Sequence, residues 1–285
     1  MSECELPPSQ VAALTPAAPG PADIEAKAEA AAISKANLPV AKMFVLAMFA
    51  GAFIAFGAAF FVMFLGDDTL TFAAQRVLGG LCFCLGLVLV LCCGAELFTG
   101  NCLMITGVMS KKIGWGGMFK NWVVVWIGNL CGALLIVFLL FMSGLQTMNH
   151  GLVGDQFVSV ALGKVTLAPA TLFFKGIMCN IFVCLAVWIG FAAKNVADKV
   201  LGILLPISAF VAMGFEHCVA KMYFLNMGLA CKAAGFGANI ANVDALNVGS
   251  VAYNLVGATL GNIVGGVVFV GLAYWFVYHK PVAAK

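Results

Sequence analysis

Six long stretches of the chain are nearly free of ionisable side chains, and the charged residues gather between them. Four stretches contain no Asp, Glu, Lys, Arg or His: 43–66, 121–149, 176–193 and 245–278. Two longer stretches carry ionisable groups near their middles: 77–110 and 200–231. Because about 20 apolar residues carry a helix across the hydrocarbon core, this pattern predicts an all-α membrane protein with six transmembrane helices in one domain, 43–278.

The two ends of the chain differ from the spans. Residues 1–22 hold five of the nine prolines and lack the apolar core of a signal peptide, so we predict a flexible cytoplasmic tail. Residues 23–42 are rich in Ala and carry spaced charges, which is typical of a helix lying at the membrane surface. Residues 279–285 are predicted to form a second, short cytoplasmic tail.

The Lys and Arg residues near the span ends predict the orientation. One side of the membrane receives ten of them: Lys27, Lys35, Lys42, Lys111, Lys112, Lys120, Lys194, Lys199, Lys280 and Lys285. The other side receives four: Arg76, Lys164, Lys175 and Lys232. Because cytoplasmic segments carry the excess of Lys and Arg, both termini are predicted to be cytoplasmic, with the protein in the inner (plasma) membrane.

Composition removes the soluble classes of function. The chain is 63% hydrophobic and 9% charged, whereas a soluble domain carries roughly 25% charged residues. A cytosolic enzyme or a nucleic-acid-binding domain is therefore excluded. Ten of the eleven Cys lie in or beside apolar runs, where Cys packs as a small hydrophobe. No Cys-x-x-Cys and no metal-ligand spacing occurs, so we expect no redox enzyme, cofactor or metal.

Two pairs of spans share short motifs. Residues 128–132 (GNLCG) match residues 261–265 (GNIVG), and residues 94–96 (GAE) match residues 214–216 (GFE). Each pair lies three spans apart, and three is odd, so the second copy would cross the membrane in the opposite direction. Such a 3+3 inverted repeat places a substrate path at the repeat interface. The alternative is chance recurrence of Gly and Asn in Gly-rich helices.

The second span is predicted to be broken at 94–101. Glu96 at membrane depth costs roughly 2.5–3.5 kcal/mol, and Gly94 together with residues 99–101 weakens the helix. Irregular backbone at this depth is tolerated only when it is buried in protein or lines a cavity. We therefore expect Glu96 and Gly94 to support the break, and Phe98 and Asn101 to face a path. The alternative is a kinked, continuous helix.

The fifth span is predicted to be broken around Gly214. Glu216, His217 and Lys221 lie within six residues, midway along an apolar run. His217 is the only His within any span, and we predict that it faces the path. We expect Glu216 to hold the loop by accepting backbone N–H bonds, with Gly214 supporting the break as Gly94 does.

Four segments resemble the formate/nitrite transporter family. They are Cys92–Asn101, Asn180–Trp188, Leu205–Met222 and Gly261–Tyr274, and the similarity covers residues 23–278. The resemblance implies an aquaporin-like six-span fold in which helices two and five are broken. It also implies a homopentamer in which each subunit has its own path.

The resemblance carries roles onto individual residues. His217 matches the family's central histidine, Thr99 a threonine that faces it, and Lys175 a lysine that draws anions inward. Two apolar constrictions are implied, Leu87 with Phe210 on the cytoplasmic side and Phe83 with Leu97 on the periplasmic side. Lys221 departs from the family, because close relatives of the formate branch usually have Asn there. It either adds positive charge beside the outer vestibule or pairs with a nearby carboxylate.

The function implied is a channel or transporter for a small monovalent weak-acid anion, with formate first. Nitrite, hydrosulfide, lactate and acetate remain alternatives. A neutral-solute channel is a remote alternative, because the chain has no Asn-Pro-Ala pair and only one His in its spans. His217 either passes a proton to the anion or acts as a fixed donor. The expected partners are the anion, membrane lipid and further copies of the chain, with no nucleic acid.

Overall fold

The computed structural model describes residues 18–280, which contain helices and connecting turns but no strand. Most of the predicted N-terminal tail and residues 281–285 lie outside the described residues. Five helical segments are long and apolar enough to cross a membrane. The prediction of an all-helical membrane protein is confirmed.

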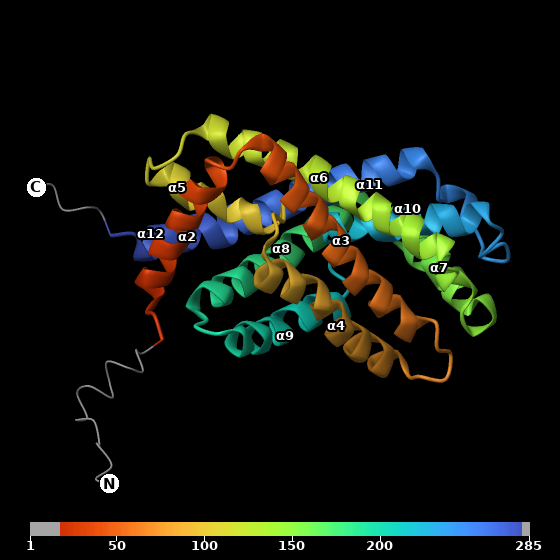
Figure 1. Cartoon of the computed structure of the whole chain (residues 1–285). Helices are drawn as coiled ribbons and strands as arrows, with labels where there is room; N and C mark the ends of the chain where they lie inside the picture. Colours follow the sequence, from red (N-terminus) through yellow and green to blue (C-terminus); the bar gives the residue numbers. More distant parts are fainter. Residues whose placement is uncertain (1–17, 281–285) are drawn as a thin grey trace, which may run out of the picture.

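The long helices account for five of the predicted spans. Their bounds are α3 Val40–Leu65, α4 Phe72–Leu89 with its π-helical extension Val90–Gly94, α6 Trp115–Met142, α8 Pro169–Ala192, and α11 Val248–Val264, which continues through π-helical Gly265–Leu272 into α12 Ala273–Tyr278. The remaining predicted span is divided between α9 Val196–Ala212 and α10 Cys218–Ala233. Figure 1 shows α4 and α9 side by side, and α6 and α11 along the opposite edge of the bundle.

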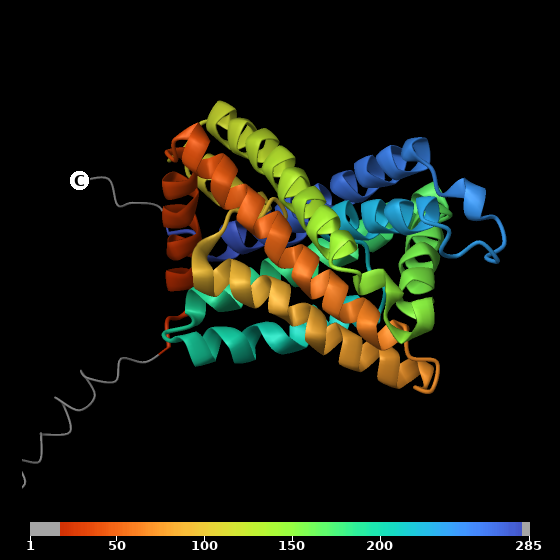
Figure 2. The ribbon, with the colours of Figure 1, turned by 45° about the vertical axis from the view of Figure 1, so that its right-hand side comes forward.

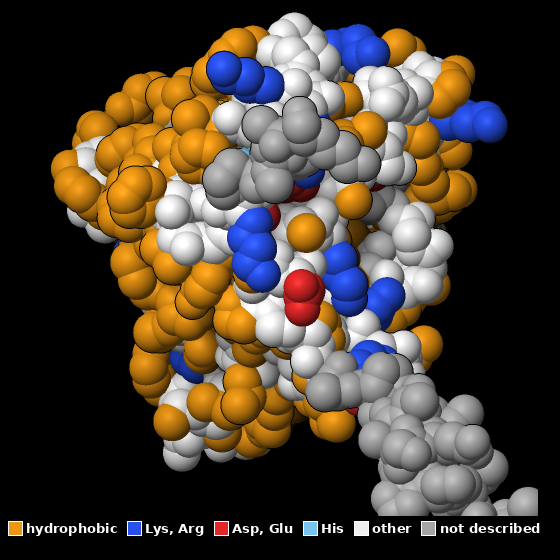
Figure 3. All heavy atoms as spheres, turned by 90° about the vertical axis from the view of Figure 1, so that its left-hand side faces the viewer, with side chains coloured by type: hydrophobic (Ala, Val, Ile, Leu, Met, Phe, Trp, Pro, Cys, Tyr) orange, Lys and Arg blue, Asp and Glu red, His pale blue; other side chains and the backbone are white. Residues whose placement is uncertain are grey.

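Two shorter helices lie at opposite ends of the bundle. Helix α2, Pro21–Ala36, runs across the end that also holds α5, Ile105–Met109, and α12 (Figures 1 and 2). Helix α7, Leu152–Val165, packs against α10 at the other end. The face bearing α2 carries scattered Lys and Arg side chains, whereas hydrophobic side chains cover the flank beside it (Figure 3). This distribution is that of a polar end beside an apolar, membrane-facing side.

Both predicted breaks are present. The second span leaves its helix at Gly94 (φ +83°), runs irregularly to Thr99 and resumes as the 3₁₀ turn Gly100–Met104. The fifth span breaks at Gly214 (φ +71°) and resumes at Cys218. Only Gly adopts this left-handed conformation without strain. The alternative of a kinked, continuous second helix is wrong.

Two asparagines hold the breaks in the same way. Each side chain accepts a bond from a backbone N–H within or directly after one break and donates to two carbonyls. For Asn129 the partners are Phe98 N (3.0 Å), Glu96 O (2.9 Å) and Ala47 O (2.8 Å). For Asn262 they are Cys218 N (2.8 Å), Glu216 O (2.9 Å) and Gly176 O (2.8 Å). These bonds satisfy backbone groups that the breaks leave without helical partners. The opposite orientation of the two halves stays a prediction.

Candidate functional site

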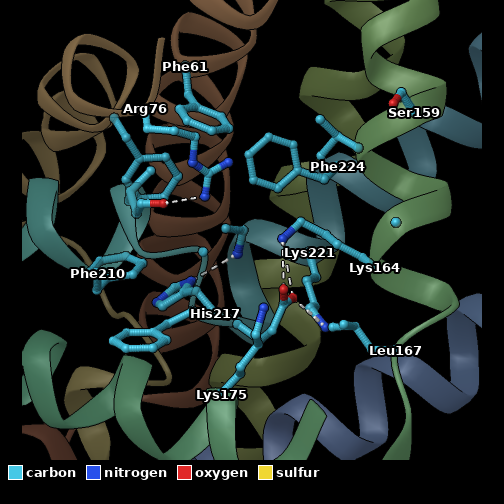
Figure 4. A pocket seen from close by; sticks show the side chains of 18 residues that line it. Phe61, Arg76, Ser159, Lys164, Leu167, Lys175, Phe210, His217, Lys221 and Phe224 are labelled. Atoms are coloured by element: carbon cyan, nitrogen blue, oxygen red, sulfur yellow. Dashed lines mark hydrogen bonds and ion pairs between the residues drawn. The ribbon is translucent and has the colours of Figure 1, made fainter. Parts of the chain in front are cut away.

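Three cavities lie in sequence between the two ends of the bundle. The first, of about 220 Å³, is lined by Glu216, His217 and four cationic residues, and we call it the Glu216 cavity (Figure 4). The second, of about 500 Å³, lies beneath α2 beside Glu96, and we call it the Glu96 cavity. The third is a space of about 10 Å³ between them. It shares His217 with the Glu216 cavity and Leu97 with the Glu96 cavity, so the three form one path.

The small central cavity is an apolar constriction. Buried apolar side chains and the His217 ring line it; the predicted constriction residues among them are Phe83, Leu87, Leu97 and Phe210. A cavity of about 10 Å³ has room for roughly one water molecule. A hydrated ion therefore has to lose its water shell to pass here.

The constriction residues pair differently from the prediction. The rings of Phe83 and Phe210 pack edge to face, 5.8 Å between centroids, and both line the Glu216 cavity. Leu97 lines the Glu96 cavity, while Leu87 lies between them. The pairing of Leu87 with Phe210 and of Phe83 with Leu97 is therefore wrong. Phe83 lies one helical turn before Leu87 on the same face of α4, so its ring reaches Phe210 on the side of the Glu216 cavity.

Phe98 does not line any of the three cavities, although the sequence predicts that it faces the path. Its ring packs edge to face on Trp122, 6.0 Å between centroids, in an apolar recess between α6 and α11. The backbone is irregular at this point, so neighbouring Leu97 and Phe98 point in different directions. Phe98 thus packs against α6, and Leu97 faces the path.

His217 and Thr99 meet at the constriction. Thr99 Oγ1 lies 2.9 Å from His217 Nε2, and both side chains are buried. His217 also caps α10, because its Nδ1 accepts a bond of 2.9 Å from the Ala220 N–H. A neutral imidazole has one donor and one acceptor nitrogen. With Nδ1 accepting, Nε2 carries the proton and donates to Thr99 Oγ1, which leaves the Thr99 hydroxyl proton to point elsewhere.

A buried four-residue group, the Glu216 cluster, lies beside His217. Lys221 Nζ lies 2.6 Å from Glu216 Oε2, and Lys164 Nζ lies 3.2 Å from each carboxylate oxygen (Figure 4). Asn254 accepts a bond of 2.5 Å from Lys221 and donates one of 2.7 Å to the Lys164 carbonyl. The prediction that the Glu216 carboxylate accepts backbone N–H bonds is wrong, because these ammonium groups occupy it.

A matching group, the Glu96 cluster, lies at the other break. Lys35 of α2 donates to Glu96 Oε1 (2.7 Å), and Asn101 Nδ2 donates to Glu96 Oε2 (2.7 Å). Asn121 accepts a bond of 2.8 Å from Asn101 and donates one of 3.5 Å to the Lys35 carbonyl. Asn101 lines the Glu96 cavity while its amide is held in this cluster.

Comparison with known proteins agrees with this geometry. The family model described as "Formate/nitrite transporter" matches residues 22–276. The chain belongs to the formate/nitrite transporter family. This is a family of transport proteins rather than enzymes, and the chain is an integral membrane protein of that family.

Named relatives of the family cover nearly the whole chain. "Formate channel FocA" of Escherichia coli (strain K12) is 37% identical over 271 residues, covering 91% of this chain and 94% of that protein. "Nitrite transporter NirC" of Salmonella typhimurium is 35% identical over 266 residues, covering 90% and 93%. The solved structure "Pentameric formate channel with formate bound" matches with a TM-score of 0.75 at 37% identity, covering 85% of this chain and 98% of that one.

The sequence did not identify four residues that lie near the path. Lys35, Arg76, Lys164 and Asn254 line the cavities or complete the clusters. Arg76 donates to the Ala212 and Val211 carbonyls at the end of α9 (2.9 and 3.0 Å). The sequence held one signal for them: burying the Glu96 and Glu216 carboxylates costs free energy, so each requires a cationic partner. Which lysines supply that cation is decided by tertiary packing.

One group away from the path has the composition of a metal site. Carboxylate oxygens of Glu25 and Glu29 and the His279 imidazole lie within 4.8 Å of one another, where α2 meets the end of α12. Lys112 and Ser110 already donate to Glu29. Burial, together with the neighbouring Glu29, raises the pKa of Glu25 to about 7. Burial acts to raise the pKa of Glu29 also, but the bonds from Lys112 and Ser110 outweigh it and lower the pKa. The group is therefore an ion-pair network.

Proposed function

We propose that this protein conducts a small monovalent weak-acid anion, with formate first, across the inner membrane through a path in each subunit of a homopentamer. The observation that carries the proposal is the constriction of about 10 Å³ at His217 and Thr99, with a larger cavity that contains ionised side chains on either side. Formate and pentameric assembly are named for the relatives at 37% identity. Nitrite is the second candidate, supported by the relative at 35% identity.

The proposed path lowers the cost of dehydrating an anion in steps. In the Glu216 cavity, Arg76, Lys164, Lys175 and Lys221 surround one carboxylate, so the potential there is positive and concentrates anions. The apolar constriction then excludes hydrated ions. At that point the Thr99 hydroxyl, held in place by His217 Nε2, supplies a donor that replaces water.

We assign His217 the role of fixed donor rather than proton source. Its Nδ1 is occupied by the Ala220 N–H, so a second proton on the ring would break the bond that caps α10. The neutral ring holds Thr99 in place and leaves the threonine hydroxyl free to donate to the anion. The alternative, proton transfer from His217 to the anion, requires that cap to open in each cycle.

We propose that the Glu96 cavity opens to the cytoplasm. Helix α2 lines this cavity and contacts the end of α12, where His279 Nδ1 lies 2.9 Å from Glu29 Oε1. The Lys and Arg residues exposed on this face are those expected of a cytoplasmic surface (Figure 3). Residues 43–278 would then form the channel domain, with residues 23–42 at the membrane surface and both tails in the cytoplasm.

Flux into proteoliposomes tests the proposal. We expect formate to enter faster than nitrite, hydrosulfide or lactate, measured at two pH values. Thr99→Val removes the hydroxyl at nearly constant volume. It should lower the flux about tenfold, which corresponds to the loss of one neutral hydrogen bond. Thr99→Ser should retain the flux. Flux no greater than in empty liposomes would refute the proposal.

A pair of His217 variants separates the two roles of the ring. If His217 is a fixed donor, His217→Asn should keep the pH dependence of formate flux, and His217→Phe should lose most flux at every pH. If His217→Asn instead abolishes the pH dependence while flux persists, the imidazole is a proton source.

A further inference from the structure

The Glu96 and Glu216 clusters are built to one plan. In each, a lysine from another helix and the residue five positions after the Glu donate to the carboxylate. In each, an asparagine then accepts from that fifth residue and donates to the lysine's own carbonyl. Only the fifth residue changes in kind. It is the neutral Asn101 in the Glu96 cluster and the cationic Lys221 in the Glu216 cluster.

This exchange changes the formal charge of the two cavities. Among the described residues that line the Glu96 cavity, Lys35 and Glu96 are the only ones of the Asp, Glu, Lys, Arg and His types, so its formal charge is zero. The Glu216 cavity has one carboxylate and four cationic residues, a formal charge of +3. An anion entering from either end therefore meets a different potential.

Lys221 also changes how the neighbouring lysine is held. Lys35 donates to Glu96 over 2.7 Å, a short charge-assisted bond. Lys164 lies 3.2 Å from both oxygens of Glu216, because Lys221 occupies the carboxylate at 2.6 Å. The Lys221 side chain is 0% exposed and that of Lys164 is 17% exposed. The buried Lys221 ammonium thus neutralises the carboxylate. The more accessible Lys164 ammonium can still donate to another group.

We propose that Lys221 sets the difference in anion affinity between the two entrances of the path. By neutralising Glu216 it leaves the Lys164 ammonium to bind the entering monovalent anion, which makes the Glu216 cavity the higher-affinity entrance. Transport should then saturate at a lower anion concentration from the Glu216 side than from the Glu96 side. This inference rests on the proposed function, namely that a monovalent anion uses this path.

Formate currents through single insertions in a planar bilayer test the inference. Formate is presented from each side in turn, and the ratio of the two half-saturating concentrations is measured. We expect a ratio of about ten for the unmodified protein, at the low end of the effect of a charged cleft, and a smaller ratio at high salt, where charges are screened. Lys221→Asn, which copies the Glu96 cluster and lowers the formal charge of the Glu216 cavity from +3 to +2, should lower the ratio about threefold.

Two further variants make the result unambiguous. Lys232→Asn removes a lysine from the other end of α10, where it binds Asp244 (3.2 Å), and should leave the ratio unchanged. Asn101→Lys places the second lysine in the Glu96 cluster, raises the formal charge of that cavity from zero to +1, and should also lower the ratio about threefold. This variant carries the test if Lys221→Asn does not fold. If formate current is present but neither Lys221→Asn nor Asn101→Lys alters the ratio, the inference is overturned and the proposed function stands. Absence of any anion current overturns the proposed function with it.

Discussion

The two ends of the path use the same cluster in different settings. At the Glu96 end the cation comes from α2, a surface helix that lies outside the spans, and the side chain of Lys35 is 25% exposed. At the Glu216 end Lys164 and Lys221 come from the bundle itself, and Lys221 is fully buried. The first cluster can therefore rearrange toward water when α2 moves, whereas the second is fixed by packing. One mouth therefore depends on the docked helix α2, and the other is part of the core.

The largest difference between the ends is expected when the carboxylates are neutralised. Glu216→Gln leaves two ammonium groups without their counter-charge, one of them fully buried, and should destabilise the protein by about 3–5 kcal/mol. Glu96→Gln leaves only Lys35, which can turn to water, and should cost about 1 kcal/mol. Thermal unfolding in detergent measures both. Equal melting temperatures for the two variants would show that the clusters are equally buried in energetic terms.

The asparagines that hold the breaks should show no such asymmetry. Asn129→Ala and Asn262→Ala each remove the same three bonds, and each buried group left unsatisfied costs about 1–3 kcal/mol. We therefore expect similar losses of melting temperature at both ends. Asn226→Ala is the control, because Asn226 donates only to the Met222 carbonyl on its own helix. A large loss at only one of the two breaks would contradict the equivalence of the halves.

The breaks were predictable because ionisable groups in an apolar run are costly. Glu96, Glu216 and His217 are recognisable in the sequence by that cost alone. The repeated Gly-Asn motif indicated only an inverted repeat, and the structure shows that its asparagines hold the breaks. The identities of the cationic partners were not predictable. Lys35 and Lys164 lie in segments that, read along the chain, look like ordinary charged connections. Only packing of α2 and α7 brings their ammonium groups to the path.

The direction of neighbouring side chains also lay beyond the sequence. In a regular helix the spacing would fix which residues face the path, but the segment from Ala95 to Thr99 is irregular. Leu97 and Phe98 are adjacent and both apolar, and nothing in the sequence distinguishes the one that lines the constriction. The same limit applies to Phe83 and Leu87, which lie on one face of α4 and separate only along the path.

Removing one lysine from each cavity should affect flux unequally. Lys35→Gln turns the Glu96 cavity from formally neutral to negative, so the entering anion is repelled, and formate flux should fall about tenfold. Lys164→Gln leaves three cationic residues around Glu216 and should lower flux about threefold. Initial rates in proteoliposomes at low ionic strength measure this. A larger loss in Lys164→Gln would mean that the Glu216 mouth depends on Lys164 alone.

The smallest effect concerns pH and the docking of α2, which supplies Lys35 to the Glu96 mouth. Glu25 lies on the buried face of α2, beside Glu29 of the same helix and His279 from the end of α12. Its pKa is raised from 4.5 to about 7 in the folded protein, so the docked helix retains a proton that the free helix releases. Docking is therefore strongest at low pH with respect to Glu25, and weakens as pH rises from about 4.5 to about 7.

Glu29 acts in the opposite sense and in another range. Its pKa is lowered, with Lys112 and Ser110 donating to it, so its contribution is lost only as pH falls below the ordinary carboxyl range. Between pH 5 and 7 we therefore expect hydrogen exchange of the α2 amides, corrected for intrinsic rates, to speed up with pH. Glu25→Gln should flatten this trend, whereas Asp23→Asn, on the exposed first turn of α2, should preserve it. If Glu25→Gln keeps the full trend, then Glu25 does not set the pH dependence of α2 docking.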